Sequence, residues 1–245
     1  MISQHDPNGI RGIVFDLDGT LVDSSVDITR AINAMLSERR KEPLEPSQVA
    51  PLLGEGARNL VASIHQIVGL PSGDAELTRD TARYLELYQR EPVRDSALFA
   101  DARQALEHFR ERGLRLGVCT NKGQRLALQV LEALDVLPFF TAVVGGDHLP
   151  VRKPDPEHLL ATVRLLGLGP EQTLFVGDSP IDVECARRAG IHCRVVDWAE
   201  IESDGLRVRR FMDLAELTAG TPPQDSTTTF PGTSTPDSTV TEVQR

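Results

Sequence analysis

Six short apolar segments, most of them separated by helical patterns, constrain the fold of this chain more than any other feature. The segments cover residues 12–17, 114–119, 141–145, 173–177, 193–197 and, with a shorter pattern, 208–211. The helical patterns between them cover residues 101–112, 123–135, 156–167 and 180–189. Strands that alternate with helices form βαβ units, and such units build a parallel sheet. We therefore predict an α/β protein with an open parallel sheet.

Residues 22–93 interrupt this alternation. They contain helical patterns at about 25–40, 57–69 and 75–90, separated by prolines and glycine, and we find no convincing strand among them. We predict that residues 22–93 form a helical cap domain inserted after the first strand. The α/β core domain would then consist of residues 1–21 and 94–219.

The end of the chain has a different composition. Of the 26 residues in 220–245, 15 are Thr, Ser or Pro. This segment has too few apolar side chains to offset the conformational entropy that folding removes. We therefore predict that residues 220–245 form a disordered tail.

Composition excludes several classes of partner. The net charge of −10 argues against nucleic acid, which requires a basic surface. No apolar run is long enough to span a membrane, and the polar N-terminus does not resemble a signal peptide. Cys119, Cys185 and Cys193 follow no zinc spacing and lie among apolar residues, so we expect reduced, buried thiols and a cytoplasmic protein. The sequence leaves monomer or homodimer undecided.

Polar residues gather where the predicted strands end. They are Asp16, Asp18, Thr120, Lys153, Asp178 and Asp182. In an open parallel sheet, ligands bind at the carboxyl edge of the strands. Burying carboxylates costs several kcal/mol unless a cation pairs with them. A lysine and a hard divalent cation would meet this need, and an oxygen-rich site suits Mg²⁺.

Most of these residues also have purely structural interpretations. Thr120 is a candidate helix N-cap, and Lys153 fits an ordinary surface position. Asp182 stands three residues after Ser179, the spacing of a capping box. Capping does not explain Asp178, which precedes the cap. A calcium loop beginning at Asp16 is excluded because its sixth position, which must be glycine, is leucine.

Together these motifs resemble the haloacid dehalogenase (HAD) superfamily and, within it, the phosphoglycolate phosphatase group. They are Asp16-Leu-Asp18-Gly-Thr-Leu-Val, Thr120-Asn-Lys, Lys153-Pro154 and Val-Gly-Asp178-Ser-x-x-Asp182. They occur in the family's order, and the resemblance covers about residues 10–195. It implies the HAD fold, a Rossmann-like parallel sheet with a helical cap inserted after the first strand.

The resemblance also implies a reaction. Asp16 would attack phosphorus to form an aspartyl phosphate, and Asp18 would act as general acid and then as general base. Thr120 and Lys153 would hold the phosphoryl oxygens. The implied activity is Mg²⁺-dependent hydrolysis of 2-phosphoglycolate or a similar small phosphorylated metabolite. An acid placed like Asp18 counts against a dehalogenase, because attack on carbon does not need it.

The remaining site residues follow from the same resemblance. Mg²⁺ would be held by Asp16, Asp178 and the backbone carbonyl of Asp18. Asn121 and Asp182 would hold these groups in position. Gly19 and Thr20 would contact the substrate.

The cap is expected to select the substrate. Gly54 and Gly56 precede a helix whose free N–H groups favour an anion, and Arg58 would bind a substrate carboxylate. The alternative is a glycine turn with a solvated arginine. The chain departs from the family's pattern after about residue 195, where Val196-Asp197-Trp198 stands in place of an expected glycine- and aromatic-rich segment.

Two other functions compete with this one. A phosphatase or phosphomutase acting on a sugar phosphate would use the same motifs. A non-catalytic binding module would be expected to lack the nucleophile or a metal-binding acid, and this chain retains Asp16, Asp18 and Asp178.

Overall fold

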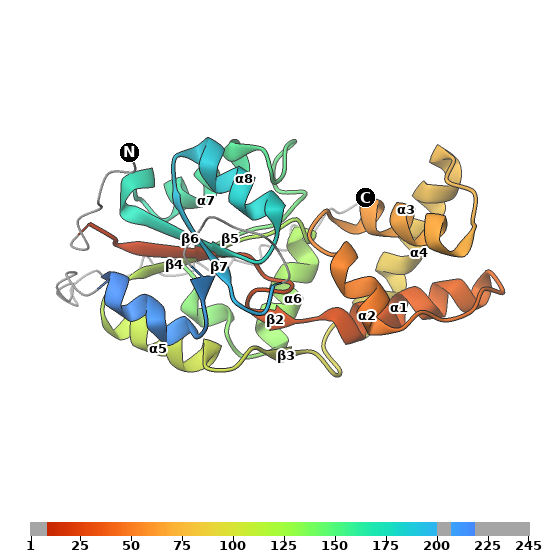
Figure 1. The fold of residues 1–245 in the computed structure, drawn as a ribbon, viewed down its shortest axis with the longest axis horizontal. Helices are drawn as coiled ribbons and strands as arrows, with labels where there is room; N and C mark the ends of the chain where they lie inside the picture. Colours follow the sequence, from red (N-terminus) through yellow and green to blue (C-terminus); the bar gives the residue numbers. More distant parts are fainter. Residues whose placement is uncertain (1–8, 200–206, 219–245) are drawn as a thin grey trace, which may run out of the picture.

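The structure, a computed structural model, describes residues 9–199 and 207–218. Its centre is a six-stranded sheet in which every pair of neighbouring strands is parallel, in the order β5-β4-β1-β6-β7-β8 (Figure 1). The strands are β1 (Gly12–Phe15), β4 (Arg115–Cys119), β5 (Ala142–Val144), β6 (Thr173–Gly177), β7 (His192–Val196) and β8 (Arg207–Val208). The predicted α/β fold is confirmed.

Helices cover both faces of this sheet (Figure 1). They are α5 (Ala102–Glu111), α6 (Gln124–Ala133), α7 (Pro156–Leu165) and α8 (Pro180–Ala189), with the short 3-10 helices η2 (Leu137–Phe139), η3 (Pro170–Gln172) and η4 (Phe211–Thr218). Alternate residues of β1 point to opposite faces of the sheet. Ile13 and Phe15 pack on one face with α5, α6 and η4, and Val14 packs on the other with α7 and α8. A strand buried on both faces reads as a continuous apolar run, which is why β1 lacks polar alternation.

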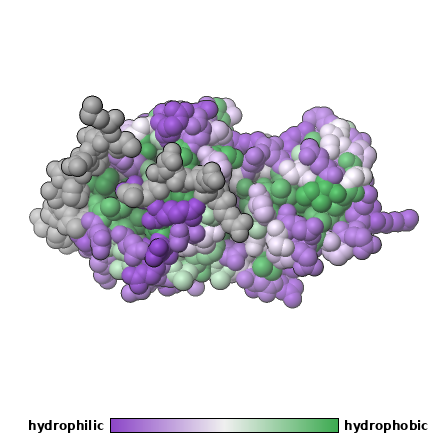
Figure 2. All heavy atoms as spheres, viewed as in Figure 1, coloured by the Kyte–Doolittle hydropathy of each residue, from purple (hydrophilic) through white to green (hydrophobic). Residues whose placement is uncertain are grey.

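A helical insertion, residues 25–90, follows β1. It contains α1 (Ser25–Glu38), α2 (Pro46–Val49), η1 (Ala50–Leu52), α3 (Ala57–Val68) and α4 (Asp74–Arg90). These helices surround their own apolar cluster, in which Ile32, Leu36 and Ile64 are fully buried. On the face in Figure 2, hydrophobic residues gather over this insertion while its outer edge is hydrophilic. The helical insertion is confirmed, and its status as a separate domain stays a prediction.

Two short strands connect the insertion to the core. β2 (Val22–Asp23) pairs antiparallel with β3 (Ala97–Leu98), so the two linkers run side by side. We expected no strand in residues 22–93, and β2 corrects this. Two residues carry no periodicity, so only the pairing partner, far away in sequence, defines the strand.

Other expectations concern the cysteines, the membrane and the tail. Cys119 and Cys185 are buried free thiols as predicted, whereas Cys193 is only partly buried. Burial raises the pKa of Cys185 to about 11, so this thiol stays protonated at neutral pH. Among the described residues, no helix is long and apolar enough to cross a membrane. The predicted tail, 220–245, lies outside the described residues.

Candidate active site

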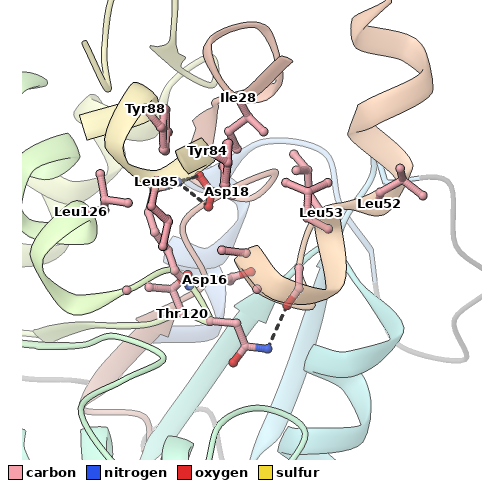
Figure 3. Close-up of a pocket in the computed structure, with 17 residues that line it drawn as sticks. Asp16, Asp18, Ile28, Leu52, Leu53, Tyr84, Leu85, Tyr88, Thr120 and Leu126 are labelled. Atoms are coloured by element: carbon pink, nitrogen blue, oxygen red, sulfur yellow. Dashed lines mark hydrogen bonds and ion pairs between the residues drawn. The ribbon is translucent and has the colours of Figure 1, made fainter. Parts of the chain in front are cut away.

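A small cavity lies over the carboxyl edge of the sheet, where the core meets the helical insertion (Figure 3). Asp16, Asp18 and Thr120 line it from the core, and Gly54 and Gly56 line it from the insertion. The cavity volume is about 50 Å³. The structure thus brings together residues that are more than 100 positions apart in sequence.

Asp16 continues β1 by one residue, which places its carboxylate at the sheet edge. Its backbone N–H donates to the Val176 carbonyl at 2.9 Å and extends the ladder to β6. Its side chain is 3% exposed, and Lys153 Nζ forms an ion pair with Asp16 Oδ1 at 2.9 Å. Lys153 also donates a 2.6 Å hydrogen bond to Asp182 Oδ1. One buried ammonium therefore serves two carboxylates.

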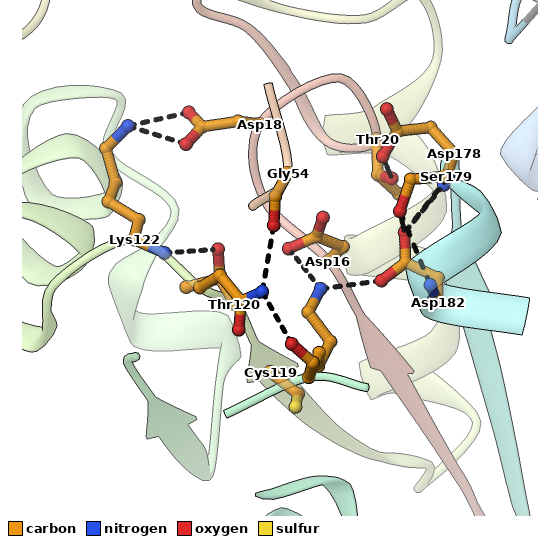
Figure 4. A network of polar contacts seen from close by, with 12 residues as sticks. Asp16, Asp18, Thr20, Gly54, Cys119, Thr120, Lys122, Asp178, Ser179 and Asp182 are labelled. Atoms are coloured by element: carbon orange, nitrogen blue, oxygen red, sulfur yellow. Dashed lines mark hydrogen bonds and ion pairs between the residues drawn. The ribbon is translucent and has the colours of Figure 1, made fainter. Parts of the chain in front are cut away.

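Asp182 both caps α8 and holds Lys153. Its Oδ2 accepts a 2.6 Å hydrogen bond from Ser179 Oγ and weaker ones from the N–H groups of Asp178 and Ser179. Its Oδ1 faces Lys153. The two interpretations of Asp182 therefore do not compete, because each uses a different carboxylate oxygen. Figure 4 shows this network.

Three acids form a cluster beside this lysine. Asp16, Asp178 and Asp182 each offer an oxygen, and these atoms lie within 4.8 Å of one another. Burial raises the pKa of Asp16 to about 6; the Lys153 ammonium opposes this rise and the Asp182 carboxylate adds to it. Burial, together with Asp182 and Asp16, also raises the pKa of Asp178 well above its ordinary value. Such a cluster needs either protons or a further cation, and its hard oxygen donors fit a divalent metal.

The acid cluster contains two of the predicted metal ligands, Asp16 and Asp178, together with Asp182. The predicted ligand from Asp18 is its backbone carbonyl, which this cluster of side-chain oxygens does not test. The side chain of Asp18 lies outside the cluster. Asp18 instead accepts 2.7 Å hydrogen bonds from Lys122 Nζ at both carboxylate oxygens, and Ser24 Oγ donates to Oδ1 at 2.6 Å. The Tyr88 ring of α4 lies against the same ammonium, with 4.7 Å between Nζ and the ring centroid. Asp18 is thus held by the insertion as well as by the core.

Gly19 and Thr20 were expected to contact the substrate, but they border Asp178. Thr20 Oγ1 donates a 2.8 Å hydrogen bond to Asp178 Oδ1, and Thr20 is fully buried. A Cβ on Gly19 would lie 2.3 Å from Asp178 Oδ2. Neither residue lines the cavity. These two residues position the acid rather than face the cavity, because the chain turns sharply after Asp18.

Asn121 connects the insertion to the segment that carries Lys153. Its side-chain amide donates to the carbonyls of Gly54 at 2.8 Å and Lys153 at 3.0 Å. The loop that begins α3 is therefore anchored to the segment carrying Lys153. This contact fits the supporting role predicted for Asn121.

Arg58 does not reach the cavity. Its guanidinium forms an ion pair with Asp74 and donates to Thr78 Oγ1 at 3.1 Å, so it connects α3 to the first turn of α4. It is absent from the residues that line the cavity. Arg58 thus lies on the face of α3 that packs beside α4, and its contact with a substrate carboxylate stays a prediction that this placement does not favour.

Comparison with known proteins places this arrangement in a family. The model of the haloacid dehalogenase-like hydrolases matches residues 13–196. The chain belongs to this family. A phosphoglycolate phosphatase of Rhodospirillum rubrum is 41% identical over 194 residues, which are 77% of this chain and 80% of that protein. A phosphoglycolate phosphatase of Caulobacter vibrioides is 36% identical over 202 residues, 82% of this chain and 85% of that protein.

Solved structures have the same fold as this haloacid dehalogenase-like hydrolase. The crystal structure of a predicted phosphoglycolate phosphatase from Haemophilus somnus covers 86% of this chain and 98% of its own, with a TM-score of 0.77 and 26% identity. CbbY from Rhodobacter sphaeroides, in complex with phosphate, gives a TM-score of 0.70 at 23% identity and covers 85% of this chain and 99% of its own. The latter likeness concerns the fold alone.

Two residues of this haloacid dehalogenase-like hydrolase were missed by the sequence analysis. The sequence analysis included Lys122 in the Thr120-Asn-Lys motif but assigned it no role, yet it forms an ion pair with Asp18. Trp198 lies in the segment that departs from the expected pattern, and its indole N–H donates to the Gly19 carbonyl at 2.9 Å. Its ring stacks on Phe99, with 4.6 Å between centroids. The departing segment therefore supports the catalytic loop, a role that only its single tryptophan could have suggested.

Proposed function

We propose that this hydrolase is a Mg²⁺-dependent phosphatase that acts on 2-phosphoglycolate, or a closely similar small phosphate ester, through an aspartyl-phosphate intermediate. The observation that carries the proposal is the placement of Asp16, paired with Lys153, on the wall of a cavity that Asp18 also lines. Relatives named phosphoglycolate phosphatase support the substrate.

The proposed reaction has two steps. Asp16 attacks phosphorus while the ester bond breaks, and Asp18 gives its proton to the departing oxygen. Asp18 then takes a proton from water, which attacks the phosphorus of the aspartyl phosphate and releases inorganic phosphate. Asp16 and the proton on Asp18 are thereby restored. Thr120 and Lys153 hold the phosphoryl oxygens as negative charge develops on them.

The acid cluster would hold Mg²⁺ through Asp16 and Asp178, with Asp182 beside them. Bound there, the ion would lower the repulsion between the anionic nucleophile and the dianionic phosphate. The fit rests on three buried carboxylates that share one lysine. Lys153 is itself held protonated, because Asp16 and Asp182 outweigh the effect of burial and raise its pKa.

The size of the cavity favours a small leaving group. One buried water needs about 10–15 Å³ on the same measure, so the cavity of about 50 Å³ would hold roughly three to five waters. A glycolate group is of this size, whereas a sugar is larger. This volume suits a small leaving group, while the relatives named phosphoglycolate phosphatase support phosphoglycolate over a sugar phosphate.

Phosphate release from a panel of esters tests the proposal. We expect release from 2-phosphoglycolate with Mg²⁺, loss of release with EDTA, and slower release from sugar phosphates. Asp16→Asn should abolish turnover without changing the circular dichroism spectrum. Activity of the variant near that of the wild type, or a clear preference for a sugar phosphate, would contradict the assignment.

A further inference from the structure

The cavity beside Asp16 has an unusual wall for an enzyme whose substrates are anions. Much of it is apolar and comes from the helical insertion, including Ile28, Leu53, Leu60, Tyr84, Leu85 and Tyr88. Among the described residues that line the cavity, Lys122 is the only cationic side chain. A carboxylate that enters such a space loses its hydration and must be paired with a cation. Among the residues that line the cavity, Lys122 is therefore the available partner for a substrate carboxylate.

Lys122 is placed to act as that partner. Its side chain is 5% exposed, and its ammonium lies against Asp18 on one side and the Tyr88 ring on the other. An ammonium has three N–H donors. Lys122 donates to both carboxylate oxygens of Asp18, which leaves one N–H without an oxygen or nitrogen acceptor among the described residues. Figure 4 shows Lys122 reaching Asp18 from the Thr120 side of the site, well apart from Asp182.

The geometry of the reaction brings the carboxylate to Lys122. To protonate the leaving group, Asp18 must contact the oxygen that bridges phosphorus and carbon. In 2-phosphoglycolate that oxygen is bonded to a methylene group that carries the carboxylate. A cation within 2.7 Å of Asp18 therefore lies beside this carboxylate when Asp18 faces the bridging oxygen.

We propose that Lys122 binds the substrate carboxylate and makes the enzyme selective for phosphate esters with a carboxylate on the carbon next to the ester oxygen. The inference rests on the proposed function. It replaces Arg58, which is paired with Asp74 outside the cavity. Arg152 is the nearest competitor: its guanidinium lies against Gly56, but it is exposed and does not line the cavity.

The test compares two substrates of equal shape. In isobutyl phosphate, two methyl groups stand where 2-phosphoglycolate has its two carboxylate oxygens. Lys122→Met should lower the ratio of kcat/KM for phosphoglycolate to that for isobutyl phosphate by about 10- to 100-fold, the value of a hydrogen bond to a charged group. Lys122→Gln, a second neutral variant that can still donate to Asp18, should lower the ratio similarly.

A matched control uses the same substitution elsewhere. The chain has three lysines, and Lys41 donates to the Val68 carbonyl at the end of α3, away from the cavity. Lys41→Met and Arg152→Met should leave the ratio unchanged. Calorimetry in the Asp16→Asn background gives a readout without turnover: adding Lys122→Met should weaken binding of phosphoglycolate and spare that of isobutyl phosphate.

Three outcomes would overturn the inference. Equal losses with both substrates would mean that Lys122 only positions Asp18. A ratio that falls with Arg152→Met and not with Lys122→Met would assign the carboxylate to Arg152. A wild-type enzyme that hydrolyses isobutyl phosphate as well as phosphoglycolate would overturn the substrate assignment itself, and this inference with it.

Discussion

Gly19 illustrates, at the scale of a single residue, how closely the site is built around its acids. It has a φ of +82°, a conformation that residues with a Cβ rarely adopt, and Asp178 Oδ2 occupies the space where a Cβ would lie. The Trp198 indole fixes the carbonyl of the same residue. Glycine at this position therefore allows the catalytic turn and the metal-site acid to be in contact.

We expect Gly19→Ala to impair the site more than the fold. The new methyl group must displace the Asp178 carboxylate, so kcat/KM should fall at least about tenfold and half-saturation with Mg²⁺ should require more metal. Phosphate release as a function of Mg²⁺ concentration measures both effects.

Gly190→Ala provides the matched control. Gly190 also has a positive φ, +67°, but nothing lies within 4 Å of its absent Cβ. This variant should lose about 1 kcal/mol of stability and keep its activity. If both variants lost activity equally, backbone strain rather than contact with Asp178 would explain the effect.

At the scale of elements, the connection between core and insertion depends on a buried carboxylate of α1. Asp27 Oδ2 accepts hydrogen bonds from the N–H groups of Arg94, Asp95 and Ser96, at 2.9, 3.0 and 2.9 Å, and from Ser96 Oγ at 2.6 Å. Asp27 Oδ1 accepts from Arg30. The Asp27 side chain thus holds residues 94–96, which connect the insertion back to the core, against α1, the first helix of the insertion.

Asp27→Asn should destabilise the protein. Burial by itself raises the pKa of Asp27, but the hydrogen bonds from Ser96, Arg94 and Arg30 outweigh it and hold the pKa well below 3.8. An amide accepts these bonds less strongly, and the loss should be about 2–3 kcal/mol in the free energy of unfolding. Chemical denaturation at pH 7 measures this loss.

The pH dependence and a control sharpen this test. Because the folded-state pKa is depressed, the contribution of Asp27 is fully present above 3.8 and is lost as the pH falls below it, so the gap between wild type and variant should narrow in acid. Asp23, an exposed linker residue that pairs with Ser25, offers Asp23→Asn as a control within about 0.5 kcal/mol of wild type. A gap that is constant with pH would contradict the role of the charge.

At the scale of the whole molecule, the acid cluster makes stability depend on pH and metal together. The pKa of Asp16 is about 6 in the folded protein against 3.8 ordinarily, so the folded state binds a proton that the unfolded state has released. Without metal, this term stabilises below pH 3.8 and is lost as the pH rises through about 6, a change of about 3 kcal/mol. A cation bound at the acid cluster would restore the stability that is lost when Asp16 ionises.

We therefore expect Mg²⁺ to raise the melting temperature much more at pH 7 than at pH 5, where protons compete with the ion. Thermal denaturation with Mg²⁺ or EDTA at both pH values measures this. Burial lowers the pKa of His158, so this residue makes the protein less stable as the pH falls. That effect is the same with and without metal, so it does not alter the comparison. Asp16→Asn should lose the part of the pH dependence that comes from Asp16, while Asp178, whose pKa is also raised, keeps its own contribution. An equal effect of Mg²⁺ at both pH values would remove Asp16 from the metal site.

The sequence by itself determined the layered core and the location of the catalytic edge. Short, continuous apolar strands with amphipathic helices between them leave few topologies other than a parallel sheet. In such a sheet the carboxyl ends of β1, β4 and β6 must meet at one edge, so Asp16, Thr120 and Asp178 could be grouped from their positions alone. The three long helices of the insertion, α1, α3 and α4, were equally readable, because local periodicity and proline spacing define them, whereas the short α2 and η1 were not predicted.

Only the tertiary structure decided which partner each side chain has. Arg58 stands at a helix start that lines the cavity, yet its rotation around α3 directs it to Asp74. Lys122 has no local signal, and its role arises from Asp18, 104 positions away. Contacts of this kind depend on the packing of the insertion against the core. Sequence periodicity specifies which face of an element is buried, but the partner on that face is set by the relative placement of elements that are distant along the chain.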